Sequence, residues 1–337
     1  MDLTTKYLGL ELKNPIIVGA SNLVIDIKML QSLEEAGAAA IVYKSLFEEQ
    51  INLENLQMQE DMDEYANRNA EMTSIFPQDI YEAGPEEFLM HFKEARKAVS
   101  IPLIASLNAV FDDTWYEWAK KLEDAGADAL ELNFYNNPRE FDMGGMAIIN
   151  EELDVIAGVK KTVNIPVSVK LSSFYTNPLY VFNEMDKKGV DGLVLFNRLF
   201  QPDINIESEK MYFPYNLSSK QDNRLPLRYA GMLYGQLNCD VCANTGIFDA
   251  EDVIKMILAG ANTVQVVSTL YKHGPQQIQK ILEDMEIWMA NKQYGSLDDF
   301  RGNLSMKKVK DPFAYRRAQY VDILMRSAEI FKQYPVL

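Results

Sequence analysis

Short apolar runs alternate with longer amphipathic stretches along most of the chain, and glycines stand at several of the boundaries between them. An amphipathic stretch ends, and a short apolar run begins, just after each of Gly37, Gly126, Gly189 and Gly260. Glycine readily adopts the left-handed backbone conformation that commonly ends a helix. Each of these units is therefore predicted to be a helix that ends at the glycine, followed by a buried strand.

A second signal marks further strands between these units. Ile101-Pro102 and Ile165-Pro166 each open an apolar run, and Cys239-Asp240 stands in the corresponding place before another. With the run at the front of the chain, eight strands are predicted, over residues 15–20, 39–44, 103–108, 129–133, 167–170, 192–197, 241–244 and 263–268. The amphipathic stretches between them include predicted helices at 26–36, 85–99, 114–125 and 249–259. Alternating strands and helices indicate parallel strands joined by crossover helices.

Eight such units predict an α/β fold, the (β/α)8 or TIM barrel, which typically needs about 250 residues plus insertions. We expect the 337 residues to form a single domain, 1–337, with a core of about 1–305. Two short apolar stretches around Gly9 predict an N-terminal hairpin across the barrel bottom, and residues 311–334 predict a C-terminal helical extension. The acidic, Met-rich stretch 46–84 is too long for an ordinary loop. It fits either a lid over the active-site face or an oligomer contact.

Composition and charge exclude several classes of protein. The formal net charge of −16 argues against a nucleic-acid surface and against a polybasic membrane contact. Two cysteines, Cys239 and Cys242, give no disulfide framework, and core packing explains them better than a metal or redox site. Because neither a signal peptide nor a run of eighteen apolar residues is visible, the expected location is cytoplasmic.

Polar side chains of few kinds follow the predicted strands. They are mainly amides, hydroxyls and lysines: Ala20-Ser21-Asn22, Lys44-Ser45, Asn108, Asn133, Lys170, Asn197, Asn244-Thr245-Gly246 and Ser268-Thr269. A single asparagine at such a place is explained by a turn. The whole set, at the barrel face that carries active sites, predicts a pocket for a polar ligand.

The turns after the last two predicted strands favour a phosphate site. Thr245-Gly246 leads into a helix, and Ser268-Thr269 follows the next strand. Barrels often bind phosphate between these two loops through backbone N–H groups, so an acidic protein needs no positive patch for it. Neither G-x-G-x-x-G nor G-x-x-x-x-G-K-[ST] is present, which argues against a Rossmann or P-loop nucleotide site.

Taken in order, these motifs resemble the dihydroorotate dehydrogenase family, and within it the soluble class 1 enzymes. The matching segments are Ala20-Ser21, Lys44-Ser45, Glu131-Leu132-Asn133, Val169-Lys170-Leu171, Asn197, Thr245-Gly246-Ile247 and Ser268-Thr269-Leu270. Residues 295–302 are similar to the closing motif of those enzymes, so that the resemblance covers about residues 1–305.

The resemblance implies an FMN cofactor, a small-molecule substrate, a homodimer and a place in pyrimidine biosynthesis. The implied FMN ligands are Ala20, Ser21, Lys44, Ser45, Asn108, Asn133, Lys170, Asn197, Thr245, Gly246, Ser268 and Thr269. The implied substrate ligands are Asn133, Asn137, Asn197 and Arg198. The charge of Lys170 beside the N1–C2 edge of the flavin would favour reduction of the ring.

The family's catalytic base, a cysteine or a serine, corresponds here to Asn136. A carboxamide has no usable basicity near pH 7, and the neighbouring Tyr135 has an ordinary pKa of about 10. Lys44 is the second residue assigned to catalysis. Pro138 and Arg198 also replace an asparagine and a serine of the family pattern.

Several functions therefore stay open. The first is an FMN-dependent oxidoreductase that acts on CH–CH groups and converts dihydroorotate or a related cyclic amide. The second is a flavin oxidoreductase on a different substrate, and the third is a flavin-binding protein without catalysis. A barrel without flavin, such as a phosphosugar isomerase, is the remaining alternative.

Overall fold

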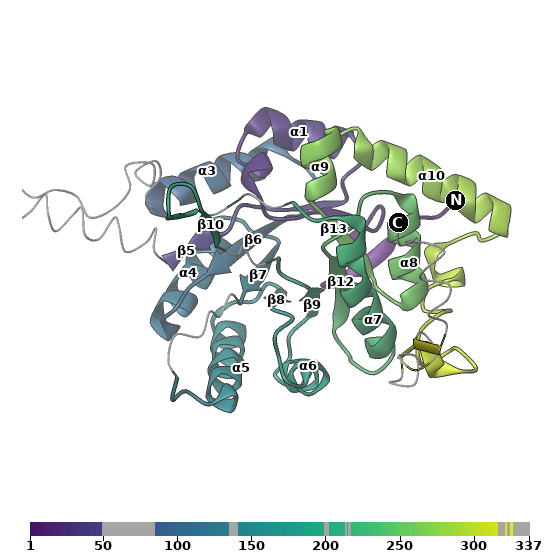
Figure 1. The fold of residues 1–337 in the computed structure, drawn as a ribbon. Coiled ribbons are helices and arrows are strands. Elements are labelled where there is room, and N and C mark those ends of the chain that lie inside the picture. Colours follow the sequence, from purple (N-terminus) through teal and green to yellow (C-terminus); the bar gives the residue numbers. More distant parts are fainter. Residues whose placement is uncertain are drawn as a thin grey trace, which may run out of the picture.

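The barrel is the centre of the molecule (Figure 1). The computed structural model describes residues 1–48, 85–134, 141–198, 202–212, 214, 217–315, 321 and 324–325. Within these residues eight parallel strands follow one another in the order β4-β3-β13-β12-β9-β8-β7-β6, and pairing of β4 with β6 closes the ring. They are β3 (Ile16–Val18), β4 (Ala40–Val42), β6 (Leu103–Asn108), β7 (Ala129–Asn133), β8 (Val167–Leu171), β9 (Gly192–Leu195), β12 (Asp240–Asn244) and β13 (Thr263–Val266). The predicted (β/α)8 barrel is thereby confirmed.

Helices surround the strands, and the predicted ones are present with ends that agree closely. The helices are α1 (Ile27–Glu35), α3 (Pro85–Ala98), α4 (Asp112–Asp124), α5 (Gly145–Thr162), α6 (Pro178–Lys187), α7 (Arg224–Leu233), α8 (Ala250–Ala259), α9 (Ser268–His273) and α10 (Gln277–Lys292). The four glycines at these boundaries have positive φ, from 85° at Gly189 to 129° at Gly260. A side chain would strain the backbone there, so the glycine marks where each helix turns back to its strand.

The core lies between the strands and the helices. Strand residues are almost all buried, and each helix turns one apolar face inward. On α4, Trp115 and Trp118 are buried, and the Trp115 ring meets Phe134 edge-on at 5.5 Å between centroids. Burying such side chains contributes roughly 1.5–3 kcal/mol each, which fixes the strand ends that carry the polar residues.

The predicted hairpin closes the bottom of the barrel. It consists of β1 (Thr5–Tyr7) and β2 (Leu10–Leu12). Its turn contains Leu8 and Gly9, with φ of 54° and 74°. The backbone N–H of Leu8 donates to Asp240 Oδ2 at 2.8 Å, and a Cβ on Gly192 would meet Leu8 and Tyr7. Because Asp240 and Gly192 begin their strands, the hairpin covers the N-terminal end of the barrel.

The closing motif predicted at residues 295–302 ties the barrel to this hairpin. The guanidinium of Arg301 donates to Thr5 Oγ1 at 2.9 Å and to the carbonyl oxygen of Ala261 at 2.5 Å. Arg301 is 9% exposed, so that these charge-assisted bonds form in a largely dry environment.

Other elements were not predicted. These are β5 (Leu46–Phe47) beside β6, the exposed hairpin of β10 (Asp203–Asn205) and β11 (Lys210–Tyr212), and the short 3-10 helices η1 (Asn22–Val24), η3 (Lys220–Asn223), η4 (Leu297–Asp299) and η5 (Pro312–Tyr315). Most of the predicted lid, 46–84, and most of the predicted helix 311–334 lie outside the described residues.

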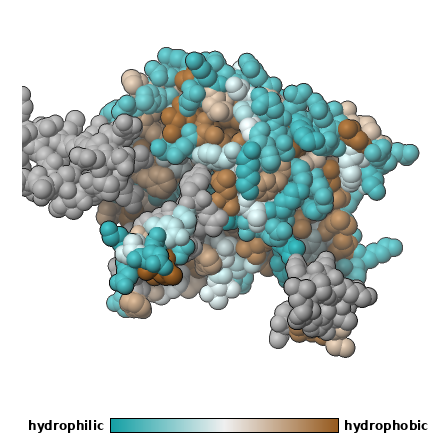
Figure 2. All heavy atoms as spheres, turned by 45° about the horizontal axis from the view of Figure 1, so that its top comes forward, coloured by the Kyte–Doolittle hydropathy of each residue, from teal (hydrophilic) through white to brown (hydrophobic). Residues whose placement is uncertain are grey.

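The outer surface is mixed in polarity. Figure 2 shows hydrophilic residues over much of one face, interrupted by hydrophobic patches. Among the described residues, no helix has the length and apolar character needed to cross a membrane.

Candidate functional site

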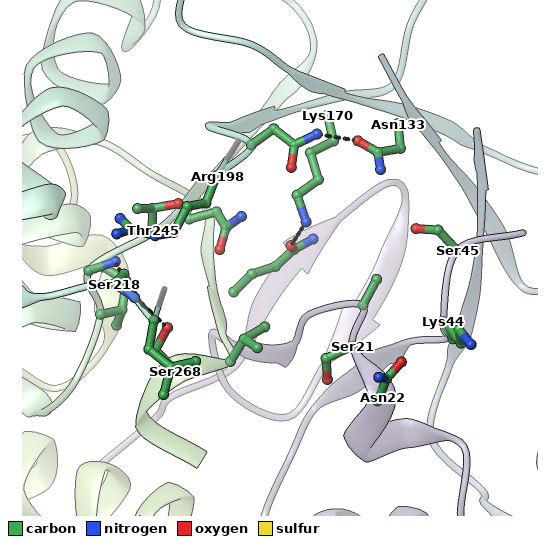
Figure 3. A pocket seen from close by; sticks show the side chains of 18 of the residues that line it. Ser21, Asn22, Lys44, Ser45, Asn133, Lys170, Arg198, Ser218, Thr245 and Ser268 are labelled. Atoms are coloured by element: carbon green, nitrogen blue, oxygen red, sulfur yellow. Dashed lines mark hydrogen bonds between the residues drawn. The ribbon is translucent and has the colours of Figure 1, made fainter. Parts of the chain in front are cut away.

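A cavity of about 490 Å³ opens at the C-terminal ends of the barrel strands (Figure 3). This volume lies within the ~300–1,000 Å³ range of small-molecule sites. Residues from the ends of six strands, β3, β4, β7, β8, β12 and β13, and from the segments that follow β9 line the cavity. The cavity therefore occupies the face at which (β/α)8 barrels bind ligands.

Three buried polar side chains form a linked group inside the barrel, next to the cavity. Lys170 Nζ donates to Gln265 Oε1 at 3.4 Å and lies 3.6 Å from Glu131 Oε1. Gln265 Nε2 in turn donates to Glu131 Oε2 at 2.5 Å. All three side chains are less than a tenth exposed, and Lys170 and Gln265 line the cavity itself. The lysine therefore presents a cation to a ligand while the carboxylate compensates its charge from below.

A wall of amides adjoins Lys170. Asn133 stands at the end of β7, and its Oδ1 accepts a 2.5 Å hydrogen bond from Asn197 Nδ2. Asn108 Nδ2 donates to the backbone carbonyl of Asn133 at 2.6 Å, which fixes the strand end from the other side. Both Asn133 and Asn197 line the cavity. This arrangement offers oriented amide groups that match a ligand with its own N–H and C=O groups.

Hydroxyl and backbone N–H groups gather at the opposite end of the cavity. Ser218 donates to Ser268 Oγ through its hydroxyl at 2.8 Å and through its backbone N–H at 3.0 Å. The Gly246 N–H donates to Ser218 Oγ at 3.3 Å. Since Ser268 Oγ accepts two hydrogen bonds here, its own proton is left to donate to a ligand. This end of the cavity therefore offers the hydroxyl proton of Ser268 to an anionic oxygen such as that of a phosphate.

The turn after β12 is held rigidly at this end. The carbonyl oxygen of Phe196 accepts from Asn244 Nδ2 at 3.1 Å and from Thr245 Oγ1 at 2.9 Å. Thr245 and Gly246 both have positive φ, 77° and 79°. A Cβ on Gly246 would lie 2.5 Å from the backbone nitrogen of Asn223. Only glycine therefore fits between this turn and the segment that carries Asn223.

The remaining side of the cavity comes from the first two strands. Ser21 Oγ is buried and has no hydrogen-bond partner among the described residues. Ser45 Oγ is bonded to Ser106 Oγ at 2.7 Å. Lys44 lines the cavity, and within the described residues no hydrogen bond or ion pair engages it. A buried hydroxyl without a partner is costly, so Ser21 is positioned to receive a ligand.

The structure brings together most of the predicted site residues. Those that line the cavity are Ala20, Ser21, Lys44, Ser45, Asn133, Lys170, Asn197, Arg198, Thr245, Gly246 and Ser268. Asn108 and Thr269 do not line it, because Asn108 is turned to the Asn133 carbonyl and Thr269 Oγ1 donates to the Phe248 carbonyl at 2.9 Å. Asn136 and Asn137, predicted for catalysis and substrate binding, lie outside the described residues.

Sequence reasoning missed two polar members of the site. Gln265 lies within the strand β13, where a lone amide in an apolar run was the available signal. Ser218 belongs to a loop whose composition carries no signal, and only its contacts with Ser268 and Gly246 reveal it.

The cysteines and the acidic residues give no metal centre. Among the described residues, no three His, Cys, Asp or Glu side chains form a group able to hold a metal ion. Burial raises the pKa of the Cys242 thiol to about 12, and burial together with the charge of Asp186 raises that of Cys239 further. Both thiols therefore stay protonated near neutral pH, as expected of packing residues.

The fold and the cavity over its strand ends define a (β/α)8 barrel protein with a cavity of small-molecule size at the usual ligand face. The family model described as dihydroorotate dehydrogenase matches residues 2–289, and the chain belongs to that family.

Relatives are similar over much of their length but at modest identity. The dihydroorotate dehydrogenase B (NAD(+)) catalytic subunit of Methanocaldococcus jannaschii is 26% identical over 292 residues, covering 84% of this chain and 92% of that protein. The protein of the same name from Thermoplasma acidophilum is 25% identical over 306 residues, covering 89% and 98%. Dihydroorotate dehydrogenase A (fumarate) of Lactobacillus helveticus is 28% identical over 212 residues, covering 58% and 68%.

Proposed function

We propose that this chain is an FMN-dependent oxidoreductase that acts on the CH–CH bond of a small cyclic amide such as dihydroorotate. One observation carries the proposal. A single cavity has the buried Lys170 and the amides of Asn133 and Asn197 at one end. At its other end it has serine hydroxyls beside the close turn at Gly246. Membership of the dihydroorotate dehydrogenase family supports the same assignment.

The residues present fit FMN. Ser268, held by Ser218 beside the turn at Thr245-Gly246, keeps its hydroxyl proton to donate to a phosphate without a positive patch. The unpartnered hydroxyl of Ser21 gives a further polar contact for a bound molecule. Lys170 would place its cation by the flavin ring, with Glu131 moderating the charge. When bound, FMN supplies a two-electron acceptor for hydride from a substrate carbon.

The chain's own residues would orient the substrate above this site. Asn133 and Asn197 are fixed to each other and present their remaining amide groups to the cavity, where they would hold the ring amides of the substrate. Lys44, whose cation no described residue pairs, would attract an acidic substituent such as a carboxylate.

Proton removal is the step that this site serves least well. The ionisable side chains among the described residues that line the cavity are Lys44, Lys170 and Arg198, so that these residues provide no carboxylate, imidazole or thiol as a base. Asn136 at the family's base position offers no basicity either. This observation favours two alternative functions. One is a flavin oxidoreductase whose substrate needs no such base, and the other is an FMN-binding protein without catalysis.

We expect a single-domain homodimer located in the cytoplasm with a role in pyrimidine biosynthesis. Cell fractionation and light scattering of the purified protein would test location and assembly.

Two measurements test the assignment. Purified protein should be yellow, or should become yellow when FMN is added. A colourless protein that does not bind added FMN would overturn every function proposed here that depends on flavin. Anaerobic mixing of the oxidised protein with dihydroorotate should bleach the flavin. Unchanged absorbance in that experiment would reject dihydroorotate as substrate and leave the two alternative functions.

A further inference from the structure

A second cleft, of about 930 Å³, adjoins the first cavity and shares Asn197, Arg198 and Thr245 with it. It lies between the end of β9, the segment after β8, the N-terminal part of α7 and the short helix η5. We call it the arginine cleft, because Arg198, Arg224 and Arg228 line it.

The charges in the arginine cleft are only partly compensated. Arg198 pairs with Asp222 at 2.8 Å, and Asp222 is also engaged by the backbone N–H of Ser219 at 2.7 Å. Asp222 is the one carboxylate among the described residues that line the cleft. Arg228 donates to backbone carbonyl oxygens, and the side chain of Arg224 makes no hydrogen bond or ion pair with the described part of the chain. Within the described part of the chain two positive charges therefore remain uncompensated, in a protein of net charge −16.

The two uncompensated arginines are arranged to act together. Arg224 and Arg228 are four residues apart on α7, which places them on the same face of the helix. Arg228 Nη2 donates to the carbonyl oxygen of Tyr315 at 2.8 Å, so that its guanidinium is held in place. A dianion matches this pair better than a single carboxylate does, because a phosphate monoester carries about −1.5 to −2 charges near pH 7.

Aromatic side chains complete the walls. Phe174 lines the cleft although it is 76% exposed, and Tyr315 lines it from the C-terminal part of the chain. Ala314 and Tyr315 lie beyond the residues 2–289 that match the family model. This wall is therefore built by a segment that the family match does not include. Flat aromatic rings with guanidinium groups nearby suit a planar ligand ring.

We propose that the arginine cleft is a binding site for a nucleotide-class ligand, a phosphate monoester attached to a flat ring, separate from the cavity over the strand ends. The phosphate would bind Arg224 and Arg228, and the ring would lie against Phe174 and Tyr315. This inference does not depend on flavin binding. It also explains why arginines cluster at this place on an acidic surface.

Calorimetric titration with adenosine monophosphate, adenosine and inorganic phosphate tests the site. Adenosine monophosphate should bind, and each of the two fragments should bind at least about tenfold more weakly. Arg224→Gln should weaken adenosine monophosphate about tenfold or more, because it removes a charge-assisted contact. Lys255→Gln, a change at an exposed ion pair on α8, should leave the affinity unaltered. Equal binding to Arg224→Gln and to the unchanged protein would overturn the proposal.

A second comparison separates this cleft from the phosphate end of the first cavity. Ser268→Ala, which alters only that cavity, should not change the affinity for adenosine monophosphate, and neither should prior saturation with FMN. Loss of binding in Ser268→Ala, or competition by FMN, would place the nucleotide in the first cavity and overturn the proposal. The result stays informative if the protein proves not to bind FMN, because the variants alone distinguish the two sites.

Discussion

The ammonium group of Lys170 lies 3.6 Å from Glu131 Oε1 inside the barrel, where both side chains are less than a tenth exposed. Glu131 Oε1 has no hydrogen bond among the described residues, so the charge of Lys170 is its compensation. Gln265 is bonded to both partners. Glu131 and Gln265, which lie within β7 and β13, therefore set the position of the Lys170 ammonium group that faces the cavity.

Lys170→Met should destabilise the protein, because it leaves the buried carboxylate of Glu131 without a counter-charge. Breaking a buried pair on one side costs roughly 3–5 kcal/mol. Combining Lys170→Met with Glu131→Gln should recover most of that loss, since no unpaired charge remains. Urea denaturation of the single and double variants measures both effects. Equal stabilities of the two variants would show that the pair is not coupled.

Gly246→Ala should abolish retention of FMN and lower stability. Its Cβ would lie 2.5 Å from the Asn223 nitrogen and 2.8 Å from the Ser219 carbonyl oxygen, so the turn must move. Gly189→Ala is the matched control, because Gly189 also has positive φ but an added Cβ there meets open space. That control should cost only the left-handed penalty of about 1–2 kcal/mol. The FMN dissociation constant and the melting temperature of the two variants are the measurements.

The stability of the protein should fall as pH rises from 4.5 to about 7 because of Glu152. Burial raises its pKa from 4.5 to about 7, although the hydroxyl of Tyr175 donates to its carboxylate at 2.8 Å and opposes the shift. The folded state therefore binds a proton that the unfolded state has released, and the contribution, roughly 3 kcal/mol, is present below pH 4.5 and lost by pH 7.

Unfolding free energies of Glu152→Gln across this pH range provide the check. The variant should lack this component of the pH dependence, whereas the neighbouring Glu151→Gln should keep most of it, because burial raises the pKa of Glu152 more than the charge of Glu151 does. If Glu152→Gln and the unchanged protein gave parallel curves, the carboxyl group would not be the source of the effect.

Asn136→Cys should accelerate bleaching of the flavin by dihydroorotate by about 100-fold or more, which is the usual contribution of a general base. Rapid anaerobic mixing measures this rate, and Asn136→Ala is the control that removes the carboxamide without adding a base. Absence of any gain with cysteine would mean that the pocket is shaped for another substrate.

Local signals explain why the fold could be predicted from the sequence. The strands predicted at 103–108 and 129–133 coincide with β6 and β7, because apolar runs mark buried strands. Ile101-Pro102 opens the first run, and Gly126 precedes the second. The hairpin of β10 and β11 has no such pattern. All six of its residues are exposed, so burial leaves no periodic trace in them.

The site could be predicted only where its residues follow strands. Asn133 and Lys170 stand at strand ends, and the barrel brings such ends together. Gln265 is different, because its role depends on Glu131, which is 134 residues away in the chain. Ser218 likewise acquires its place through Ser268, 50 residues later. Contacts between such distant residues have no signature in a single sequence.

The hairpin beneath the barrel imposes an order on ligand traffic. Tyr7 and Leu8 cover the lower end, so that among the described residues the cavity beside Lys170 opens toward the strand ends. In the proposed enzyme, a cofactor bound beside Lys170 would therefore bind before the substrate above it and would leave after that substrate. The hairpin of β1 and β2 would thereby favour slow exchange of the deeper molecule and fast exchange of the upper one.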